Sequence, residues 1–464
     1  MSDTKASSKQ MDMLNGSIGD KILYFAIPLA VTGILQQLFN AADIAVIGRF
    51  VGKNAMAAVG SNSPITALII NLFTGISIGA NVVIARFIGQ NHKEGVKMTV
   101  HTALLFAVLC GTVFAVICEV ISRPILSLMS IPDNVFDMAL LYFRVYIGGM
   151  PVILLYNFAS AIFRSQGNTK TPLICLLISG IINVLFNLFF VLVLKMTVNG
   201  VALATVLSNL ISSALLIFFL TREDSAIHFS FKDLRIDWRT LREMIRIGLP
   251  AGIQGMVFSF SNIIIQSSIN KLGEDVMAAS SAAFNLEIFA YYIINAFGQA
   301  CTTFVGQNYG AGKSDRCLKA TRLSLIQDLI FTAVLSVIIL LTGKYFLMIF
   351  NDDPVIADIG MIRLKYIVGA EVINVVIEIV SGCMRGYGHS FVPALMCTAG
   401  ICGVRIIWSC TAFKTYPSFD VLMTAYPLSW LVTAAALVIS YFWMKKHALK
   451  NFFASVPEQD SIAP

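Results

Sequence analysis

Residues 87–91 have the sequence Phe-Ile-Gly-Gln-Asn, and residues 304–308 have the sequence Phe-Val-Gly-Gln-Asn. Further matched pairs lie along the chain at almost the same separation: Pro28 and Pro250, Met56-Ala57-Ala58 and Met277-Ala278-Ala279, Arg164 and Arg385, and Pro172 and Pro393. The separation stays between 217 and 222 residues throughout, so convergent composition at helix ends is the weaker explanation. The repeat predicts two similar halves.

The composition around this repeat is typical of a membrane protein. Of 464 residues, 57% are hydrophobic and 13% are charged, against roughly 25% charged in an average soluble domain. The mean hydropathy is +0.79. These values exclude a disordered chain, a collagen-like chain and an ordinary soluble enzyme.

Apolar stretches of about 20 residues can each cross a bilayer as a helix. Such stretches lie near residues 22–48, 57–86, 97–121, 138–163, 171–194, 200–221, 244–270, 276–305, 320–342, 358–384, 390–413 and 420–444. Six spans per half is an even number, so the halves share one orientation. We therefore expect an all-α polytopic membrane protein with 12 transmembrane helices. They should form two six-helix bundles related by a pseudo-two-fold axis along the membrane normal, with the substrate site between them near the midplane.

The loops predict the domain boundaries and the orientation. We expect an N-terminal six-helix lobe over 1–221, a cytoplasmic amphipathic linker over 222–243 and a C-terminal six-helix lobe over 244–464. Of the 33 Lys and Arg residues, 22 lie on the side that carries both termini, 10 lie on the other side, and Arg405 lies inside a span. The positive-inside rule then places both termini in the cytoplasm of a multi-pass plasma (inner) membrane protein. The net charge of +7 is attributed to this basic surface, and we expect no nucleic-acid partner.

The linker has a helical pattern of its own. Phe231, Leu234, Trp238, Leu241 and Ile245 recur at helical spacing with Lys and Arg between them. This pattern predicts an interfacial amphipathic helix on the cytoplasmic leaflet, with a plain solvated linker as the alternative.

Patterns of ATP hydrolysis and of metal binding are absent from the sequence. The segment 306–314 resembles a Walker A loop, but the position of the first required glycine is occupied by Gln307. The nine cysteines include no CxxC pair, so we interpret them as apolar packing residues. We expect no enzymatic activity, no catalytic residue and no cofactor, and an ion gradient or the substrate's own gradient as the energy source.

The first span carries an acid on a polar face. Thr32, Gln36, Asn40 and Asp43 are spaced four, four and three residues apart, which places them on one side of a helix. An ionisable residue inside a span costs at least ~2.5–3.5 kcal/mol at the midplane, so it is a functional candidate. With no basic residue on this face, Asp43 is predicted to take up a proton or Na⁺.

A second polar face lies in the fifth span. Ser179, Asn183 and Asn187 recur every four residues there. Their oxygens could complete a cation shell around Asp43 or hydrogen-bond its protonated form. Structural hydrogen bonding between helices is the alternative.

The second half carries more charge inside its spans. Glu287 lies near the middle of one span, Glu371, Asn374 and Glu378 share a face of another, and Arg405 lies in a third. One Arg cannot neutralise three Glu, so we expect at least one carboxylate to bind a proton, an ion or a cationic substrate. The alternative is a static Arg405–Glu pair with protonated glutamates.

Aromatic residues flank the acid in the eighth span. Phe284 and Tyr291 lie on either side of Glu287, and an acid with aromatic neighbours suits a greasy cation. The predicted substrate-binding residues are Glu287, Phe284, Tyr291, Glu371, Glu378 and Arg405.

Several motifs occur in a fixed order along nearly the whole chain. They are Phe39-Asn-Ala-Ala-Asp43, Gly48-Arg49, Gly52, Ala57-Ala-Val-Gly60, Tyr142-Phe-Arg144 with Gly148, Phe163-Arg-Ser-Gln-Gly167, and Asn183 with Asn187. In this order the chain resembles the MATE family of multidrug and toxic compound extrusion transporters, in particular its bacterial members.

The resemblance implies cation-coupled antiport, in which H⁺ or Na⁺ enters as an organic cation leaves by alternating access. It maps the family's helix 1 acid onto Asp43 and its helix 5 Asn onto Asn183. Many members follow that Asn with an Asp and a Pro, where this chain has Asn187 and Leu188. Some branches also carry an acid between the positions of residues 250 and 265, and this chain has none there.

Two functions are compatible with the sequence. The main one is a cation-driven exporter of drugs. We expect its substrates to be small cationic or amphipathic molecules, its other partner to be membrane lipid, and the protein to be a monomer. The alternative is a flippase for a lipid-linked saccharide or a related exporter of the same superfamily.

Pro28 and Pro250 further predict that the first and seventh spans bend during transport, with static kinks as the alternative.

Overall fold

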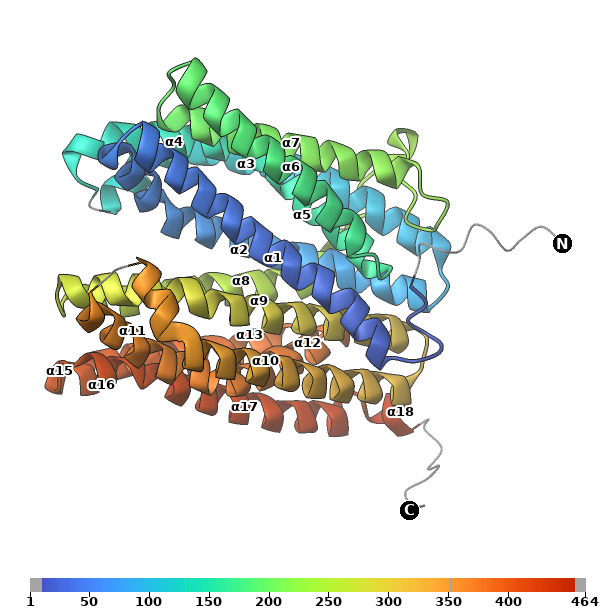
Figure 1. The fold of residues 1–464 in the computed structure, drawn as a ribbon. Helices are drawn as coiled ribbons and strands as arrows, with labels where there is room; N and C mark the ends of the chain where they lie inside the picture. The colour runs from blue at the N-terminus through green and yellow to red at the C-terminus, as the bar shows by residue number, and fades with distance from the viewer. Residues whose placement is uncertain (1–10, 130, 351–352, 455–464) are drawn as a thin grey trace. The chain divides into compact units, whose positions relative to one another are not determined.

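The structure, a computed structural model, describes residues 11–129, 131–350 and 353–454. Throughout these residues the secondary structure is helical (Figure 1). The chain divides into two compact units. Unit 1 consists chiefly of Pro28–Ile84 and His92–Gly252, and unit 2 consists of Asp12–Ile27, Ala85–Asn91 and the chain from Ile253 onward.

Seven helices form the first half of the chain: α1 (Gly19–Phe50), α2 (Lys53–Gly89), α3 (Lys93–Leu128), α4 (Asp133–Gly148), α5 (Met150–Ser165), α6 (Lys170–Leu188) and α7 (Val198–Thr221). A π-helical turn, Phe189–Val193, continues α6. The chain bends by 48° between α4 and α5. This break lies at Gly149, two residues before Pro151, because proline cannot donate a backbone hydrogen bond to the preceding turn.

Eleven helices form the second half: α8 (Trp238–Asn270), α9 (Glu274–Gly310), α10 (Ser314–Phe350), α11 (Pro354–Ile367), α12 (Glu371–Gly386), α13 (Phe391–Cys397), α14 (Val404–Cys410), α15 (Ala412–Thr415), α16 (Phe419–Met423), α17 (Ala425–His447) and α18 (Lys450–Ala454). A 3₁₀ turn at Val368–Ala370 joins α11 to α12 into one stretch, and a π-helical segment at Thr398–Gly403 joins α13 to α14.

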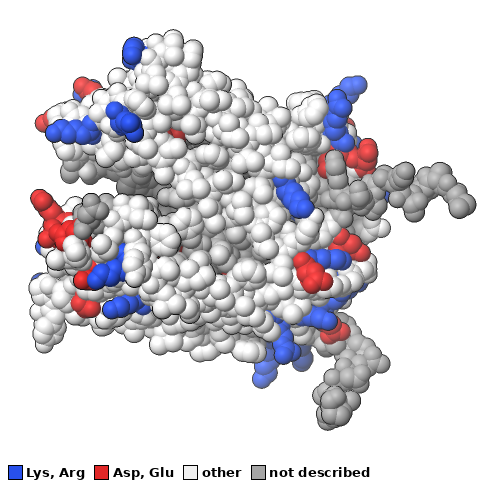
Figure 2. All heavy atoms as spheres, in the orientation of Figure 1, with Lys and Arg blue, Asp and Glu red and all other residues white. Residues whose placement is uncertain are grey.

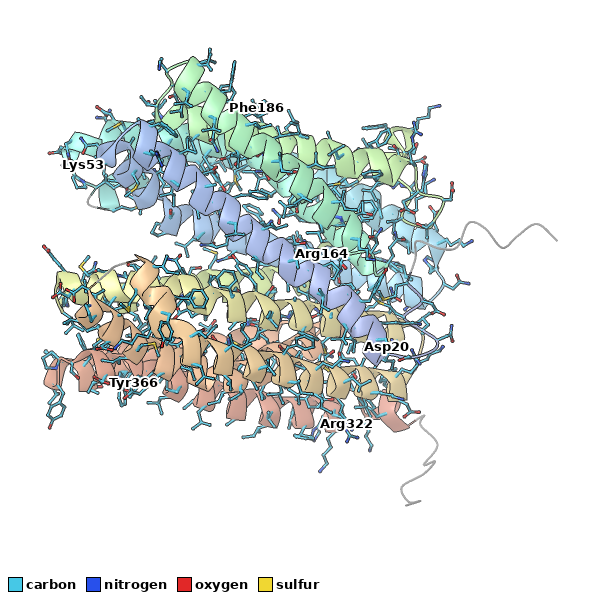
Figure 3. All side chains as sticks on the ribbon, in the orientation of Figure 1. Asp20, Lys53, Arg164, Phe186, Arg322 and Tyr366 are labelled. Atoms are coloured by element: carbon cyan, nitrogen blue, oxygen red, sulfur yellow. The ribbon has the colours of Figure 1, made fainter. Side chains whose placement is uncertain are left out.

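The described residues contain 11 helical stretches that are long and apolar enough to cross a membrane, or 12 if the bent pair α4–α5 counts as one. Each stretch coincides with one of the predicted spans to within a few residues at either end, which confirms an all-α, multi-pass membrane protein. Charged side chains on the visible face gather toward the helix ends, and the flanks between them are largely uncharged (Figure 2). In unit 2, Asp20 and Arg322 lie at one end and Tyr366 lies toward the other (Figure 3).

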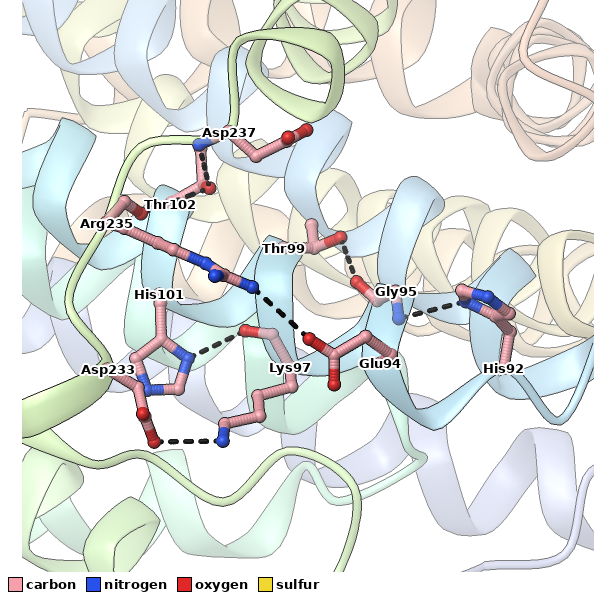
Figure 4. Close-up of polar contacts among 10 residues, drawn as sticks. All are labelled: His92, Glu94, Gly95, Lys97, Thr99, His101, Thr102, Asp233, Arg235 and Asp237. Atoms are coloured by element: carbon pink, nitrogen blue, oxygen red, sulfur yellow. Dashed lines mark hydrogen bonds and ion pairs between the residues drawn. The ribbon is translucent and has the colours of Figure 1, made fainter.

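The linker between the halves is not the predicted amphipathic helix. Among residues 222–237 the only helical element is a 3₁₀ turn at Phe231–Asp233, and α8 begins at Trp238. The segment instead packs against α3 (Figure 4). His101 Nε2 lies 3.1 Å from the backbone nitrogen of Ser230, and the backbone nitrogen of Asp237 donates to Thr102 Oγ1 at 3.0 Å. These contacts satisfy backbone groups that a helix would have paired internally.

Two ion pairs add to this attachment (Figure 4). Lys97 Nζ lies 2.9 Å from Asp233 Oδ2, and Arg235 lies 3.2 Å from Glu94. The hydrogen bond from Lys97 lowers the pKa of Asp233 below its usual value. The sequence pattern is divided between two elements, because Phe231 lies in the 3₁₀ turn and Leu241 and Ile245 lie in α8, so it does not form one continuous helical face.

Helices α2 and α8 touch backbone to backbone within unit 1. A Cβ atom added at Gly75 would lie 2.1 Å from the backbone nitrogen of Gly252, and one added at Gly79 would lie 2.1 Å from the carbonyl oxygen of Met244. The partner glycine Gly248 would place a Cβ 2.6 Å from Ile76. Glycine is required at these positions because no side chain fits between the helices.

All nine cysteines are free, and seven of them are buried. This agrees with the interpretation of most of them as packing residues.

Candidate functional site

The first candidate site is the carboxylate of Asp43 in unit 1. Asp43 lies in α1 and is 7% exposed. Asn187 Nδ2 of α6 donates to Asp43 Oδ1 at 2.5 Å. Thr205 Oγ1 of α7 lies 3.1 Å from Asp43 Oδ2. Three helices therefore meet at this carboxylate, and both contacts come from neutral side chains.

The amide of Asn187 links Asp43 to the other predicted Asn. Its Nδ2 also donates to Asn183 Oδ1 at 3.2 Å. One amide nitrogen has two hydrogens and here serves two acceptors. The four-residue spacing on α6 thus places both Asn side chains in one chain of hydrogen bonds that ends at Asp43.

The hydroxyl of Thr205 has two possible acceptors. Its Oγ1 lies 3.0 Å from the carbonyl oxygen of Val201 and 3.1 Å from Asp43 Oδ2. A hydroxyl has a single hydrogen, so it can donate fully to only one of them. Both contacts become good hydrogen bonds when Asp43 is protonated, because Asp43 then donates to Thr205 and Thr205 donates to Val201.

The structure does not join the remaining predicted residues of this site to Asp43. Gln36 and Asn40 are exposed, and no described hydrogen bond connects either of them to Asp43. Ser179 is buried and donates to the carbonyl oxygen of Leu176 in its own helix at 3.0 Å. The face of α1 that carries Gln36 and Asn40 is therefore not the face that meets α6.

Two tyrosines of α4 complete the surroundings of Asp43. Tyr142 and Tyr146 are buried, their rings stack with centroids 6.0 Å apart, and both lie close enough to interact electrostatically with Asp43. Sequence spacing alone missed them, together with Thr205, because the contact depends on how different helices pack.

The second candidate site is a polar cluster in unit 2, and its centre is an ion pair between α9 and α11. Arg363 donates to both carboxylate oxygens of Glu287, from Nε at 2.9 Å and from Nη2 at 2.5 Å. A third donor of the same guanidinium bonds Ser280 Oγ at 2.7 Å. Arg363 is one of the ten Lys and Arg residues that the charge count assigned to the outer side. It is instead 5% exposed inside the unit, because α11 begins at Pro354 and brings residue 363 into the packed region.

Aromatic rings connect this pair to Arg405. The guanidinium carbon of Arg405 lies 4.1 Å from the ring centre of Tyr426 and 5.6 Å from that of Phe258. The carbon of Arg363 lies 5.9 Å from the Tyr426 ring. Tyr291 stacks on Phe258 with centroids 6.2 Å apart. The structure thus brings three predicted residues, Glu287, Tyr291 and Arg405, into one cluster.

Arg405 itself is bonded to neutral groups. Its Nη1 donates to Asn262 Oδ1 at 3.0 Å and its Nε to Ser429 Oγ at 3.3 Å. The alternative of a direct Arg405–Glu pair is therefore wrong for the described residues. Phe284 lies beside the cluster, with its ring centre 5.8 Å from the guanidinium carbon of Arg363.

The two glutamates of α12 have different partners. Glu371 accepts from Asn374 Nδ2 at 2.9 Å and lies close enough to Arg405 to interact electrostatically. Glu378 accepts from Arg385 at 3.2 Å. The expectation that one Arg faces three Glu is thus corrected, because Arg363 and Arg385 also lie among them. Of these three carboxylates, Glu371 has no bonded cation among the described residues.

No group of three or more His, Cys, Asp and Glu residues in the described chain is arranged to hold a metal ion. The oxygen atoms at Asp43, Asn183 and Thr205 are hard ligands of the kind that Na⁺ accepts. However, the Nδ2 group of Asn187 occupies one of the approaches to the carboxylate.

Comparisons with known proteins agree with this architecture. The MatE family model matches residues 28–189 and 250–411, one match in each half of the chain. The probable multidrug resistance protein YoeA of Bacillus subtilis is 28% identical over 93% of this chain and 95% of its own length. The probable multidrug resistance protein NorM of Thermotoga maritima is 24% identical over 84% of each chain.

A solved structure of a MATE in complex with MaL6 has the same fold. It superposes with a TM-score of 0.87 at 21% identity, covering 96% of this chain and all of the other. Two repeated matches to the family model, over more than half of the residues, agree with the internal duplication and with the position of Asp43 in the first match. The chain therefore belongs to the MATE family of multidrug and toxic compound extrusion transporters.

Proposed function

We propose that this transporter is a proton-coupled antiporter that exports organic cations across the plasma membrane by alternating access, with Asp43 as the proton carrier. The arrangement of Asp43, Thr205 and Val201 carries the proposal. A protonated Asp43 lets Thr205 keep both of its contacts, at 3.1 and 3.0 Å, whereas an ionised Asp43 forces the hydroxyl to choose between them.

This competition links proton binding to helix position. When Asp43 loses its proton, either the contact between α1 and α7 or the bond from Thr205 to its own helix weakens. Each such hydrogen bond contributes about 0.5–1.5 kcal/mol. A membrane potential of 100 mV supplies ~2.3 kcal/mol per charge, which is large enough to bias a rearrangement of this size.

The donors around Asp43 favour H⁺ over Na⁺. A bound Na⁺ requires oxygen ligands on all sides. Asn187 instead presents Nδ2 to Asp43 Oδ1 and is held in that orientation by Asn183 Oδ1. Na⁺ binding would require this amide to turn and lose both bonds, whereas a proton on Oδ2 requires no rearrangement.

The cluster in unit 2 is the proposed contact for cationic substrates. Glu371 is the carboxyl group available to bind a cation, because Glu287 and Glu378 are already bonded to Arg363 and Arg385. Tyr291, Phe258 and Tyr426 supply aromatic surface for an amphipathic cation. The multidrug resistance proteins among the relatives support this substrate class.

The test is dye efflux from liposomes that hold the purified full chain, with pH and Na⁺ gradients imposed separately. We expect a pH gradient to drive efflux and a Na⁺ gradient alone to drive none. Asp43→Asn keeps the size of the side chain, removes its titratable charge and should abolish gradient-driven efflux.

The matched control is Asp137→Asn, the same substitution at an exposed position of α4, which should retain full activity. Efflux driven by Na⁺ alone would overturn proton coupling. Wild-type efflux by Asp43→Asn, at equal amounts in the membrane, would overturn the role of Asp43.

A further inference from the structure

Helix α10 carries a buried polar stripe that neither candidate site includes. Ser324, Asp328, Thr332 and Ser336 recur every four residues, which places them on one face of the helix. All four are buried, and Asp328 is 0% exposed. An acid at the centre of a membrane-spanning helix is costly and therefore calls for a physical reason.

The carboxyl group of Asp328 is only half satisfied. Oδ1 accepts from Thr332 Oγ1 at 3.2 Å, a contact within the same helix. Oδ2 is buried and has no hydrogen-bond partner among the described residues. No Lys, Arg or His of the described chain forms an ion pair with it. In an ionised Asp328 the unpartnered oxygen would share a negative charge with no donor to stabilise it.

The charged groups on the neighbouring helices make an ionised Asp328 less favourable still. Those that act on it are two further carboxyl groups, Glu371 and Glu378 of α12, and a negative charge on either one disfavours a negative charge on Asp328. The cation of α12, Arg385, is bonded to Glu378. Two further ion pairs lie on elements that pack against α10: Glu287 of α9 with Arg363 of α11, and Asp358 of α11 with Lys344 of α10 itself. Glu274 and Asp275 lie in the first turn of α9, and Lys365 lies in the last turn of α11.

The fold does not require an acid at this position. The repeat separation of 217 to 222 residues maps Asp328 onto residues 106–111 of α3, which are Phe, Ala, Val, Leu, Cys and Gly. The equivalent helix of the first half is therefore built without an acidic or basic residue there. A carboxyl group that the architecture can omit, in a costly place, is better explained by a role in binding than by packing.

We propose that Asp328 is a second proton-binding site, in unit 2, and that it holds a proton on Oδ2 at neutral pH. The proton restores a neutral carboxylic acid and adds an O–H donor where the ionised group has an unpartnered oxygen. That this proton takes part in transport rests on the proposed function, because it assumes that the chain is driven by a proton gradient. Asp43 and Asp328 would then bind coupling protons in different units.

Infrared spectroscopy of the full chain in liposomes tests the bound proton directly. Asp43 and Asp328 are the two buried aspartates among the described residues. Labelling aspartate with ¹³C at the side-chain carboxyl separates their protonated carbonyl band from that of glutamate. In Asp43→Asn, we expect one labelled band at neutral pH, which shifts in D₂O and disappears as the pH is raised.

The band should be lost in Asp43→Asn combined with Asp328→Asn, and kept when Asp43→Asn is combined with Asp315→Asn, an exposed acid in the first turn of α10. If Asp328→Asn does not fold, Asp328→Glu moves the band from the aspartate label to a glutamate label and decides the same point. Absence of the band in Asp43→Asn, or its persistence without Asp328, overturns the proposal.

A transport measurement tests the coupling. Asp328→Asn alone should lower the number of protons moved per dye molecule, whereas Asp315→Asn should leave it unchanged. An unchanged ratio in Asp328→Asn would overturn the coupling role. If the wild type showed no proton-driven efflux at all, the proposed function would fail, and the infrared result would still decide whether Asp328 holds a proton.

Discussion

Arg363 determines how much of the charge of Glu287 is available to a ligand. Both carboxylate oxygens accept hydrogen bonds from one guanidinium, and Ser280 takes a further donor. A bidentate, buried pair of this kind is strongly held because neither partner can return to water without breaking several bonds. A substrate cation would have to compete with a fixed internal one, so a substrate contact at Glu287 remains a prediction.

We therefore expect Glu287→Gln to act first on stability. It leaves the Arg363 guanidinium buried without its counter-charge, a loss of about 3–5 kcal/mol for a pair of this type. The measurement is the unfolding free energy of the purified protein in micelles. Replacing both residues, Glu287→Gln with Arg363→Gln, should recover much of that loss.

The control for this prediction is Asp358→Asn, which removes one partner of the exposed Lys344–Asp358 pair. That change should cost no more than about 1 kcal/mol. A Glu287→Gln variant as stable as the wild type would show that the pair is not maintained in solution.

Single residues were predictable where spacing along one helix was enough. The acid in the first span and the four-residue spacing of Asn183 and Asn187 led to Asp43 and its partner. Thr205 and Arg363 were missed because each meets its partner across two helices, which no periodicity encodes. Asp328 did carry a signal, a lone acid in the stretch 320–342.

At the scale of elements, the linker shows how backbone contacts override a helical pattern. Residues 222–237 exchange internal hydrogen bonds for bonds to α3, at His101 and Thr102. Lys97–Asp233 and Arg235–Glu94 add exposed pairs, which stabilise little on their own. The attachment should therefore depend mainly on His101 and Thr102.

His101→Ala should release this linker from α3 and expose its basic residues to trypsin. The expected result is a several-fold faster cleavage between residues 222 and 239, because local opening governs proteolysis of a folded chain. The control is Thr99→Val, because the Thr99 hydroxyl bonds Gly95 within α3. Equal cleavage rates in all three proteins would argue that the linker is not held by His101.

The pH dependence of cleavage tests the same attachment of the linker to α3. The pKa of Asp233 is lowered, so its pair with Lys97 stabilises the docked linker at every pH above the usual pKa of an aspartate. This stabilisation is lost only when the pH falls through the lowered pKa of Asp233. A change in cleavage near neutral pH would therefore have to come from another group.

Most elements followed from hydrophobic stretches alone. The observed helices extend beyond the predicted spans at many ends, because a helix continues past the apolar stretch, as α2 does from Lys53 to Gly89. The break between α4 and α5 at Gly149 was not predicted, since hydropathy does not distinguish a straight span from a bent one.

At the scale of the whole molecule, the division into units passes through two of the proline-containing helices. In α1 the boundary falls at Pro28, and in α8 it falls after Gly252, two residues beyond Pro250. Thr32 Oγ1 also bonds the carbonyl oxygen of Pro28 at 2.8 Å, and such back-bonding promotes bending. The two matched prolines thus lie where each helix passes from one unit to the other.

Pro28 should allow α1 to adopt two shapes, and Pro28→Ala should restrict it to one. The measurement is double electron–electron resonance between spin labels at Tyr24→Cys and Leu38→Cys, two exposed positions that flank Pro28, in a background whose native cysteines are replaced. We expect two distance populations whose ratio changes with pH in the parent and a single population in Pro28→Ala.

The control pair for this measurement is Phe331→Cys and Tyr345→Cys on α10, exposed positions with the same spacing along the helix and no proline between them, whose distance should not respond to pH. One unchanging distance in the parent on α1 would contradict bending at Pro28.

The fold of the molecule was predictable because the sequence contains an internal repeat. Two copies of the same motifs indicated two similar halves, and the family model matches both, at residues 28–189 and 250–411. The repeat could not reveal which parts of α1, α2 and α8 belong to which unit, because that depends on packing after the chain has folded. It also concealed Asp328, which has no counterpart in the first half.

The backbone contact between α2 and α8 limits how this protein can vary over evolutionary time. Gly75, Gly79, Gly248 and Gly252 each face the main chain of the opposite helix. A larger residue at any one of them pushes the two helices apart and removes the reason for glycine at the other three. These four positions should therefore co-vary. Relatives that lack one of the glycines should also lack the others and should have a wider separation between the two helices.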